Sequence, residues 1–245
     1  MSQTAASPSL PTIAFIGGGN MASAIIGGLI HQGHPASQIE VVEPWAEARE
    51  ALRKNYGIEA QAEAGPALQR AQIVVWAVKP QTFRDAAAQA KAHTQGALHL
   101  SVAAGIRSDS IAQWLGTERI VRTMPNTPAL VGKGMSALYA RPAVSAPERQ
   151  SIEAIMATTG EFLWVDSEPQ LDAVTALSGS GPAYVFYFLE AMTRAGTGMG
   201  LTEQQAHQLA VGTFVGASEL ARRSDDPPSV LRQRVTSKGG TTYAA

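Results

Sequence analysis

A glycine-rich turn close to the N-terminus is the first segment whose residue types and spacing could do chemistry. It comprises Gly17, Gly18, Gly19, Asn20, Met21 and Ala22, directly after the apolar run Ile13–Ile16. Gly17 would permit a tight turn, Gly19 would let the backbone approach a pyrophosphate, and Ala22 would let a helix pack closely on a strand. The free N–H groups and the dipole of that helix favour a bound phosphate. We therefore predict that residues 17–22 bind a dinucleotide cofactor.

An acidic residue follows the next apolar run at about the spacing expected of a ribose-binding carboxylate. Glu43 would accept hydrogen bonds from the adenosine ribose and would repel the 2′-phosphate of NADP, which favours NADH. Arg49 and Arg53 lie one and two helical turns further on and could hold that phosphate instead. A plain surface glutamate before Pro44 is the alternative without a function. The expected cofactor is thus NADPH or NADH, with Glu43 among its contacts.

Two further strand ends carry candidate residues. Ala77, Val78, Lys79 and Pro80 close the third expected strand, and Val102, Ala103 and Ala104 lie at the end of the fourth. The carboxyl ends of strands line the ligand site of doubly wound sheets, and these small side chains would leave room for a nicotinamide ring. Lys79 is expected beside the cofactor as a candidate catalytic residue, although a solvated surface lysine is the more frequent outcome.

Three other segments combine hydroxyls, glycines and prolines in patterns that a bare dinucleotide-binding fold lacks. They are Arg122–Pro128, Leu177–Tyr184 and Val235–Thr242. Ser180 precedes Gly-Pro as at a helix start, and Ser178 stands where a nucleophile elbow needs glycine, which disfavours a serine hydrolase. Residues 237–242 place hydroxyls beside glycine amides, as suits a bound carboxylate, and a flexible glycine loop explains them about equally well.

Composition narrows the class of protein. The 245 residues are 45% apolar and 16% charged with a formal net charge of −1, which indicates a globular chain with no electrostatic preference for nucleic acid or an acidic membrane surface. The absence of cysteine excludes disulfides and thiolate catalysis, and the five histidines have no metal-ligand spacing, so no metal is expected. Residues 1–11 resemble neither a signal nor a transit peptide, and no apolar run approaches membrane-spanning length. We expect a cytoplasmic protein with a short flexible N-terminus at residues 1–11.

Strands and helices alternate through the first two thirds of the chain. Expected strands are Ile13–Ile16, Ile39–Val42, Ile73–Val78, Leu98–Val102, Ile120–Thr123, Ser136–Ala140 and Glu161–Val165, and expected helices there are Asn20–His31, Trp45–Asn55, Gln81–Ala90, Ser108–Leu115 and Pro147–Thr159. Strands that are apolar throughout suit a parallel sheet buried on both faces. The fold class is α/β: a Rossmann-type doubly wound sheet over residues 12–166.

Only helices are expected over residues 167–245. They are Gln170–Leu177, Pro182–Ala195, Thr202–Arg223 and Ser229–Val235. Apolar side chains such as Val185, Phe186, Phe188 and Leu189 cover several faces of one helix, so that helix must be buried on more than one side. A small helical domain cannot provide this alone, and we infer a subunit interface in an all-helical dimerisation domain.

Together these residues resemble the Δ1-pyrroline-5-carboxylate reductase family over residues 13–245. The glycine turn and Val78–Pro80 are shared with several reductases, whereas the combination of Met124–Pro128, Ser178–Tyr184 and Ser237–Thr242 is much more specific. The resemblance implies that NAD(P)H gives a hydride to the C=N carbon of the cyclic imine 1-pyrroline-5-carboxylate, forming L-proline. It also implies a homodimer or larger homo-oligomer whose active sites each form between one subunit's Rossmann domain and its partner's helices.

The resemblance assigns the substrate residues as well. Ser237, Gly239, Gly240, Thr241 and Thr242 would hold the substrate carboxylate, with Thr242, a candidate catalytic residue, near the imine nitrogen. A protonated imine brings its own proton, so orientation and electrostatics can suffice without an acid. The helical part contains one lysine, Lys238, and lacks the helix-borne catalytic lysine of related hydroxyacid dehydrogenases.

Three features depart from the family's pattern. Lys238 replaces the usual proline, which should loosen the carboxylate loop or add a positive charge beside it, and Ala64 replaces a cofactor-contacting asparagine. The sequence stops at Ala245, just inside the helix expected after the loop, and a natural end there would leave Thr242 with less support. The alternatives are a reductase of another cyclic imine, a hydroxyacid dehydrogenase, against which the missing helix lysine argues, and a catalytically silent dinucleotide-binding protein.

Overall fold

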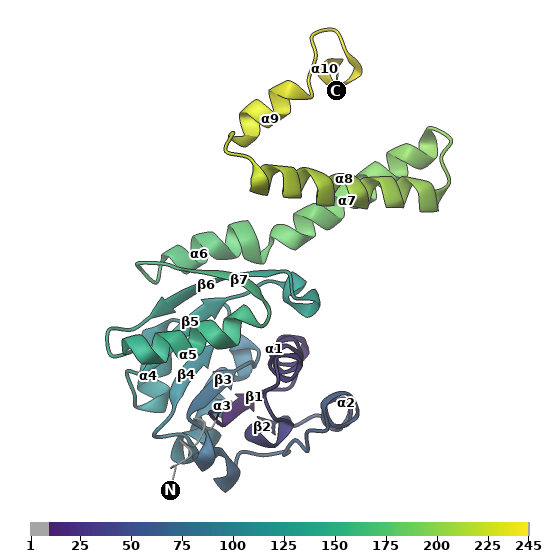
Figure 1. Ribbon diagram of the computed structural model, residues 1–245. Coiled ribbons are helices and arrows are strands. Elements are labelled where there is room, and N and C mark those ends of the chain that lie inside the picture. The colour runs from purple at the N-terminus through teal and green to yellow at the C-terminus, as the bar shows by residue number, and fades with distance from the viewer. Residues whose placement is uncertain (1–9, 245) are drawn as a thin grey trace, which may run out of the picture. The chain divides into compact units, whose positions relative to one another are not determined.

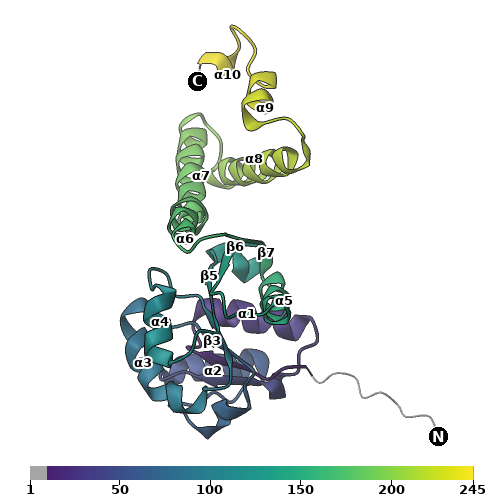
Figure 2. The ribbon, with the colours of Figure 1, turned by 90° about the vertical axis from the view of Figure 1, so that its left-hand side faces the viewer.

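The computed structural model describes residues 10–244, which form two compact units (Figures 1 and 2). The first unit extends to Pro182 and the second covers residues 183–245. Most of the expected flexible N-terminus, residues 1–9, lies outside the described residues. No helix among residues 10–244 is both long and apolar enough to cross a membrane.

The elements follow the order expected from the sequence. The strands are β1 (Ile13–Ile16), β2 (Ile39–Val42), β3 (Ile73–Trp76), β4 (Leu98–Ser101), β5 (Ile120–Met124), β6 (Gly134–Ala140) and β7 (Gly160–Trp164). The α-helices are α1 (Asn20–His31), α2 (Ala46–Tyr56), α3 (Phe83–Ala90), α4 (Ser108–Leu115), α5 (Ala146–Ala157), α6 (Gln170–Val174), α7 (Gly181–Gly198), α8 (Glu203–Arg223), α9 (Pro228–Arg234) and α10 (Thr241–Ala244). Short 3-10 helices occur at Ala36–Gln38, Pro66–Arg70, Pro80–Thr82, Lys91–His93 and Thr127–Val131, and a π-helical turn at Thr175–Gly179.

The seven strands form one sheet in the order β2-β1-β3-β4-β5-β6-β7. Strands β1 to β5 are parallel, β6 is antiparallel to β5, and β7 runs parallel to β6. The carboxyl ends of β1 to β5 therefore meet at one edge, and the chain reverses its direction of travel across the sheet between β1 and β3. Ligands of doubly wound sheets bind at that switch point. The predicted fold class is confirmed.

Several predicted ends of strands and helices are wrong by one to three residues, and two of these differences concern the site. Strand β3 ends at Trp76 rather than Val78, because Ala77 already leads into the loop that closes over the glycine turn. The helix expected to end at Leu177 is α-helical only to Val174 and widens into the π-helical turn, which belongs to the contacts described below.

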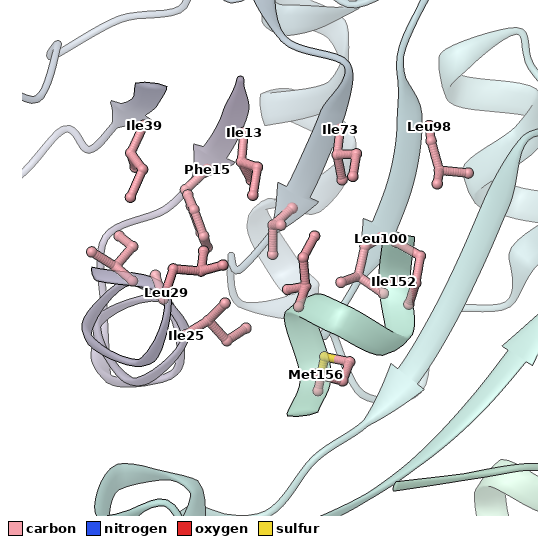
Figure 3. Close-up of a cluster of buried hydrophobic side chains, with 14 of the residues drawn as sticks. Ile13, Phe15, Ile25, Leu29, Ile39, Ile73, Leu98, Leu100, Ile152 and Met156 are labelled. Carbon is pink, nitrogen blue, oxygen red and sulfur yellow. The ribbon is translucent and has the colours of Figure 1, made fainter. Parts of the chain in front are cut away.

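The core has two layers, one on each face of the sheet. Alternate residues of a strand point to opposite faces, so Ile13 and Phe15 of β1 pack under α1 and α5, while Ala14 and Ile16 face α3 and α4 (Figures 2 and 3). All four of these β1 residues are at most 3% exposed. Burial on both faces explains why the strand sequences are apolar throughout. Because both faces are covered, a site can form only where loops follow the strands, at the edge of the sheet.

Apolar side chains remain exposed on the two long helices of the second unit. They include Tyr184, Val185, Phe186, Tyr187, Phe188 and Met192 on α7 and Leu209, Val215 and Leu220 on α8. Single subunits of soluble proteins rarely expose so many large apolar side chains on neighbouring turns. The wide apolar arc predicted from the sequence is therefore present, and much of it is exposed among the described residues of α7 and α8.

Candidate functional site

The glycine turn between β1 and α1 has a conformation that only glycine can provide. Gly17 has φ of +98°, and its N–H donates to the carbonyl of Val42 in β2 at 2.8 Å. A Cβ at this position would lie 2.5 Å from the carbonyl oxygen of Ala77. The turn is thus held between the ends of β2 and β3, where the order of the strands changes.

The next glycines form a cradle suited to a phosphate. Gly19 is the N-cap of α1, where no side chain caps the helix, and a Cβ on it would meet no heavy atom within 4 Å. The N–H groups of Asn20, Met21 and Ala22 precede the first helical hydrogen bond, from the Ser23 N–H to the Gly19 carbonyl at 2.9 Å, so they have no carbonyl partner within α1. Ala22 is fully buried against the sheet, as the small-residue position of the motif requires. The turn fits the pyrophosphate of a dinucleotide by its shape and its donors.

The structure gives Glu43 a bond network that sequence reasoning missed. Its side chain is buried, with Oε2 accepting the N–H of Gly18 at 2.7 Å and Oε1 accepting the N–H of Trp45 at 2.9 Å. Each carboxylate oxygen can accept a second hydrogen bond, so a ribose hydroxyl could still be bound. Glu43 therefore also shapes the glycine turn. Arg49 donates to the carbonyls of Glu43 and Pro44.

The loops after β3 and β4 complete the edge where the nicotinamide is expected. The N–H of Val102 donates to the carbonyl of Trp76 at 3.1 Å, and Ala103 is buried. The neighbours Ala77, Val78 and Ala104 are partly buried, whereas Lys79 and Pro80 are exposed. Lys79 thus stands at the predicted edge with a solvated side chain, which fits both interpretations of this residue.

A buried pair of side chains, Trp76 and His99, links β3 and β4 next to this edge. The Trp76 indole N–H donates to Nδ1 of His99 at 3.0 Å across β3 and β4, and the Trp76 ring stacks on Phe83 with centroids 4.9 Å apart. Burial, and to a lesser degree the nearby Arg119 charge, lowers the pKa of His99 to about 4. The histidine is therefore neutral at pH 7 and accepts the indole proton as a fixed part of the core.

Arg122, the first residue of one singled-out segment, has a structural partner. It is buried in β5 and its Nη1 lies 2.7 Å from Oε1 of Glu168. Glu168 also accepts the N–H and the hydroxyl of Ser108, at 2.5 and 2.9 Å. Burial alone would raise the pKa of Glu168, but the bonds from Ser108 and Arg122 together lower it. This buried pair fastens the segment before α6 to the sheet, where α6 packs on β5 and β6.

The expected substrate loop lies in the second unit and has a defined turn. The N–H of Gly240 donates to the carbonyl of Ser237 at 3.0 Å, and Gly239 has φ of +77°. A four-residue turn with positive φ at its third position is a type II turn. Lys238 occupies the second position and is exposed, and α10 begins directly after the turn, with Thr242 exposed in it. The lysine has therefore not prevented the turn from forming.

Comparison with known proteins decides the family. The pyrroline-5-carboxylate reductase of Pseudomonas aeruginosa is 46% identical over 239 residues, which cover 97% of this chain and 88% of that protein. The chain belongs to the pyrroline-5-carboxylate reductase family. The family's enzyme from Haemophilus influenzae is 42% identical over 95% of this chain and 87% of its own length.

Solved structures of pyrroline-5-carboxylate reductases share the whole fold. The enzyme from Coxiella burnetii has a TM-score of 0.87 at 37% identity, covering 96% of this chain and 88% of that one. The Plasmodium falciparum enzyme, solved with NADP bound, has a TM-score of 0.86 at 28% identity over 96% and 87% of the two chains. Residues 168–245 match the family described as pyrroline-5-carboxylate reductase dimerisation, and residues 12–105 match the one described as NADP oxidoreductase coenzyme F420-dependent. The resemblance drawn from the sequence motifs is confirmed, and the match of residues 168–245 to the dimerisation family supports oligomerisation.

Proposed function

We propose that this chain reduces Δ1-pyrroline-5-carboxylate to L-proline with NAD(P)H. The observation that carries the proposal is the similarity to pyrroline-5-carboxylate reductases along nearly the whole chain, 46% over 97% of its residues. The relatives bear the name of that activity, and both the phosphate cradle and the type II turn of this chain are formed.

The cofactor would bind along the carboxyl edge of the sheet. The turn from Gly17 to Ala22 would hold the pyrophosphate, and Glu43 would accept a ribose hydroxyl while it anchors Gly18. Residues 77–80 and 102–104 would flank the nicotinamide, with the exposed Lys79 among them. The bound cofactor would supply the hydride. The protein would orient the cofactor, and its small apolar side chains would exclude water from the site.

The substrate would be held by its carboxylate. Ser237, Gly239, Gly240 and Thr241 would provide N–H and hydroxyl donors, and the Thr242 hydroxyl would lie near the imine nitrogen. A protonated imine already carries the proton that the product amine keeps, so these residues need only orient it and stabilise its charge. Among residues 10–244, no group of three or more histidine or acidic side chains could hold a metal ion. The proposed hydride transfer needs none.

The helical part would form a homodimer or a larger homo-oligomer. The exposed apolar residues of α7 and α8 provide the surface, and the dimerisation family match covers them. A biosynthetic reductase of this kind would act in the cytoplasm, on a small molecule, without nucleic acid or membrane partners.

The decisive assay follows the oxidation of NADH and NADPH side by side with pyrroline-5-carboxylate as the only substrate. Oxidation that yields proline in equal amount supports the proposal, and Thr242→Val, which keeps the side-chain shape, should lower kcat about tenfold or more. Faster turnover of a cyclic imine of another ring size would assign a different substrate. Cofactor binding without oxidation would support a silent dinucleotide-binding protein.

A further inference from the structure

Two of the segments singled out by sequence meet in one joint of the first unit. The Nδ2 group of Asn126 donates to the carbonyl oxygen and to the hydroxyl of Ser178, both at 3.2 Å. Its Oδ1 accepts the N–H of Met135 at 2.9 Å, and the Ser178 hydroxyl donates to the Met135 carbonyl at 3.3 Å. Both ends of the carboxamide are therefore hydrogen-bonded. Asn126, Met135 and Ser178 form a closed ring of hydrogen bonds, and these three residues make up the joint.

The chemistry of the partners fixes the orientation of the Asn126 carboxamide. The Ser178 carbonyl can only accept a hydrogen bond, and the Met135 N–H can only donate one. A flipped carboxamide would oppose oxygen to oxygen and N–H to N–H. Only an amide side chain of this length satisfies both partners, so asparagine is required by hydrogen bonding and not merely by size.

The joint holds a π-helical turn. Ser178 lies in the turn Thr175–Gly179, which the Ser180 N–H closes with a 2.9 Å bond to the carbonyl of Thr175. A Cβ on Gly179 would lie 2.5 Å from Cε of Met124, so the turn also sits directly on the end of β5. Single π turns often occur at functional sites, because they re-aim a few residues without ending the helix.

The position of the joint relates it to the cofactor edge. Ser101 of β4 pairs with Arg122 of β5, so residues 102–104, which follow β4, and residues 124–126, at and just beyond the end of β5, occupy neighbouring places on the carboxyl edge of the sheet. The first of these segments is the expected wall of the nicotinamide site. The turn held by Asn126 therefore stands at the nicotinamide end of the edge, far along the sheet from β2, which carries the expected ribose contact.

We propose that Asn126 is a positioning residue for hydride transfer, holding the π turn Thr175–Gly179 at the nicotinamide end of the site. The proposal rests on the proposed function. Asn126 acts through Ser178 and Met135, to which the two ends of its carboxamide are hydrogen-bonded, and is therefore not a catalytic residue. Its loss would leave the phosphate and ribose contacts of β1 and β2 in place, so the placement of the reacting groups should suffer and cofactor affinity should not.

The test variant is Asn126→Asp. It keeps the shape and the acceptor for Met135, but it sets an oxygen against the Ser178 carbonyl. We expect kcat to fall about 10- to 100-fold, as for small misplacements of reacting groups, while the Kd of NAD(P)H stays within about threefold. The isotope effect on kcat from cofactor deuterated at the transferred position should rise, and amide exchange over residues 178–180 should quicken about tenfold or more. Asn55→Asp, the same change at an exposed position of α2, is the matched control and should alter none of these.

Each outcome decides the proposal. Unchanged exchange in the turn overturns it, and so does faster exchange with wild-type kcat and isotope effect. Should Asn126→Asp fail to fold, Ser178→Ala removes only the hydroxyl from the joint and should give the same pattern with a three- to tenfold fall in kcat; wild-type kcat there is refutation. A wild-type chain that does not reduce pyrroline-5-carboxylate refutes the proposed function, whereas the exchange comparison needs no substrate and still tests whether Asn126 holds the turn.

Discussion

Replacing Gly19 by alanine should separate cofactor binding from folding. The residue has φ of −73°, which any amino acid adopts, and an added Cβ meets nothing within 4 Å. Alanine is a poorer N-cap than glycine by about 0.5 to 1 kcal/mol, and the lower entropy of the unfolded chain returns about 0.4 to 1 kcal/mol. The free energy of unfolding should therefore change by no more than about 0.5 kcal/mol.

The same methyl group should weaken the cofactor strongly. It would occupy the open space beside the first turn of α1, where a phosphate must come within hydrogen-bond distance of the N–H groups. A hydrogen bond to a charged group contributes about 1.5 to 3 kcal/mol, so the loss of one predicts a rise in the Kd of NAD(P)H of roughly 10- to 150-fold.

Fluorescence titration of NAD(P)H and thermal unfolding, run on the same preparation, measure both quantities. Gly96→Ala is the matched control, because Gly96 also has open space around it but precedes β4, at the opposite edge of the sheet. Gly17→Ala should instead unfold the first unit, since its Cβ would strike Ala77. A Gly19→Ala chain that binds the cofactor as tightly as the wild type would show that the phosphates do not lie on this turn.

Three further outcomes are expected. Because burial lowers the pKa of His99 to about 4, the folded state stays neutral at this residue while the unfolded chain gains a proton below pH 6.5; stability should fall by about 3 kcal/mol between pH 6.5 and 4. Urea unfolding should show a flatter acid limb for His99→Gln, and equal slopes would contradict the shift. Glu43→Gln turns an amide N–H toward a backbone N–H, so it should weaken both cofactors, NADH by several-fold more than NADPH since the charge that repels the 2′-phosphate is gone; an unchanged ratio of the two Kd values would remove Glu43 as the discriminator. Lys238→Pro should keep kcat/KM within about threefold, because proline suits the second position of a type II turn, whereas Gly239→Ala at φ of +77° should lower it about tenfold or more; the reverse order would argue against this turn in the active enzyme.

Local sequence signals were sufficient for most of the fold. Apolar runs that end at glycine, proline or a polar turn located all seven strands, and the spacing of Gly17, Gly19 and Ala22 located the cofactor turn. These signals succeed because each depends on residues close together in the chain. The family resemblance depended on motifs of the same kind and was confirmed.

The sequence alone could not predict contacts between residues that lie far apart in the chain. The bonds of Glu43 to the backbone of Gly18, of Arg122 to Glu168 and of Asn126 to Ser178 span 25, 46 and 52 residues. A single sequence carries no periodic pattern for such partners, so it does not reveal the bonds of Glu168, and it predicts α-helix for the residues of the π turn. The roles of Lys79 and Thr242 remain predictions, because they concern atoms of bound molecules.

The exposed aromatic side chains of α7 have a consequence for how the protein must be handled. When a surface is covered only by association, folded and unfolded populations are linked to the concentration of chains. Each tenfold dilution toward the dissociation constant should remove about 1.4 kcal/mol of apparent stability per association step. Specific activity should then decline in very dilute assays and return on concentration, so the durability of the helical unit is set by the amount of protein in solution as well as by its sequence.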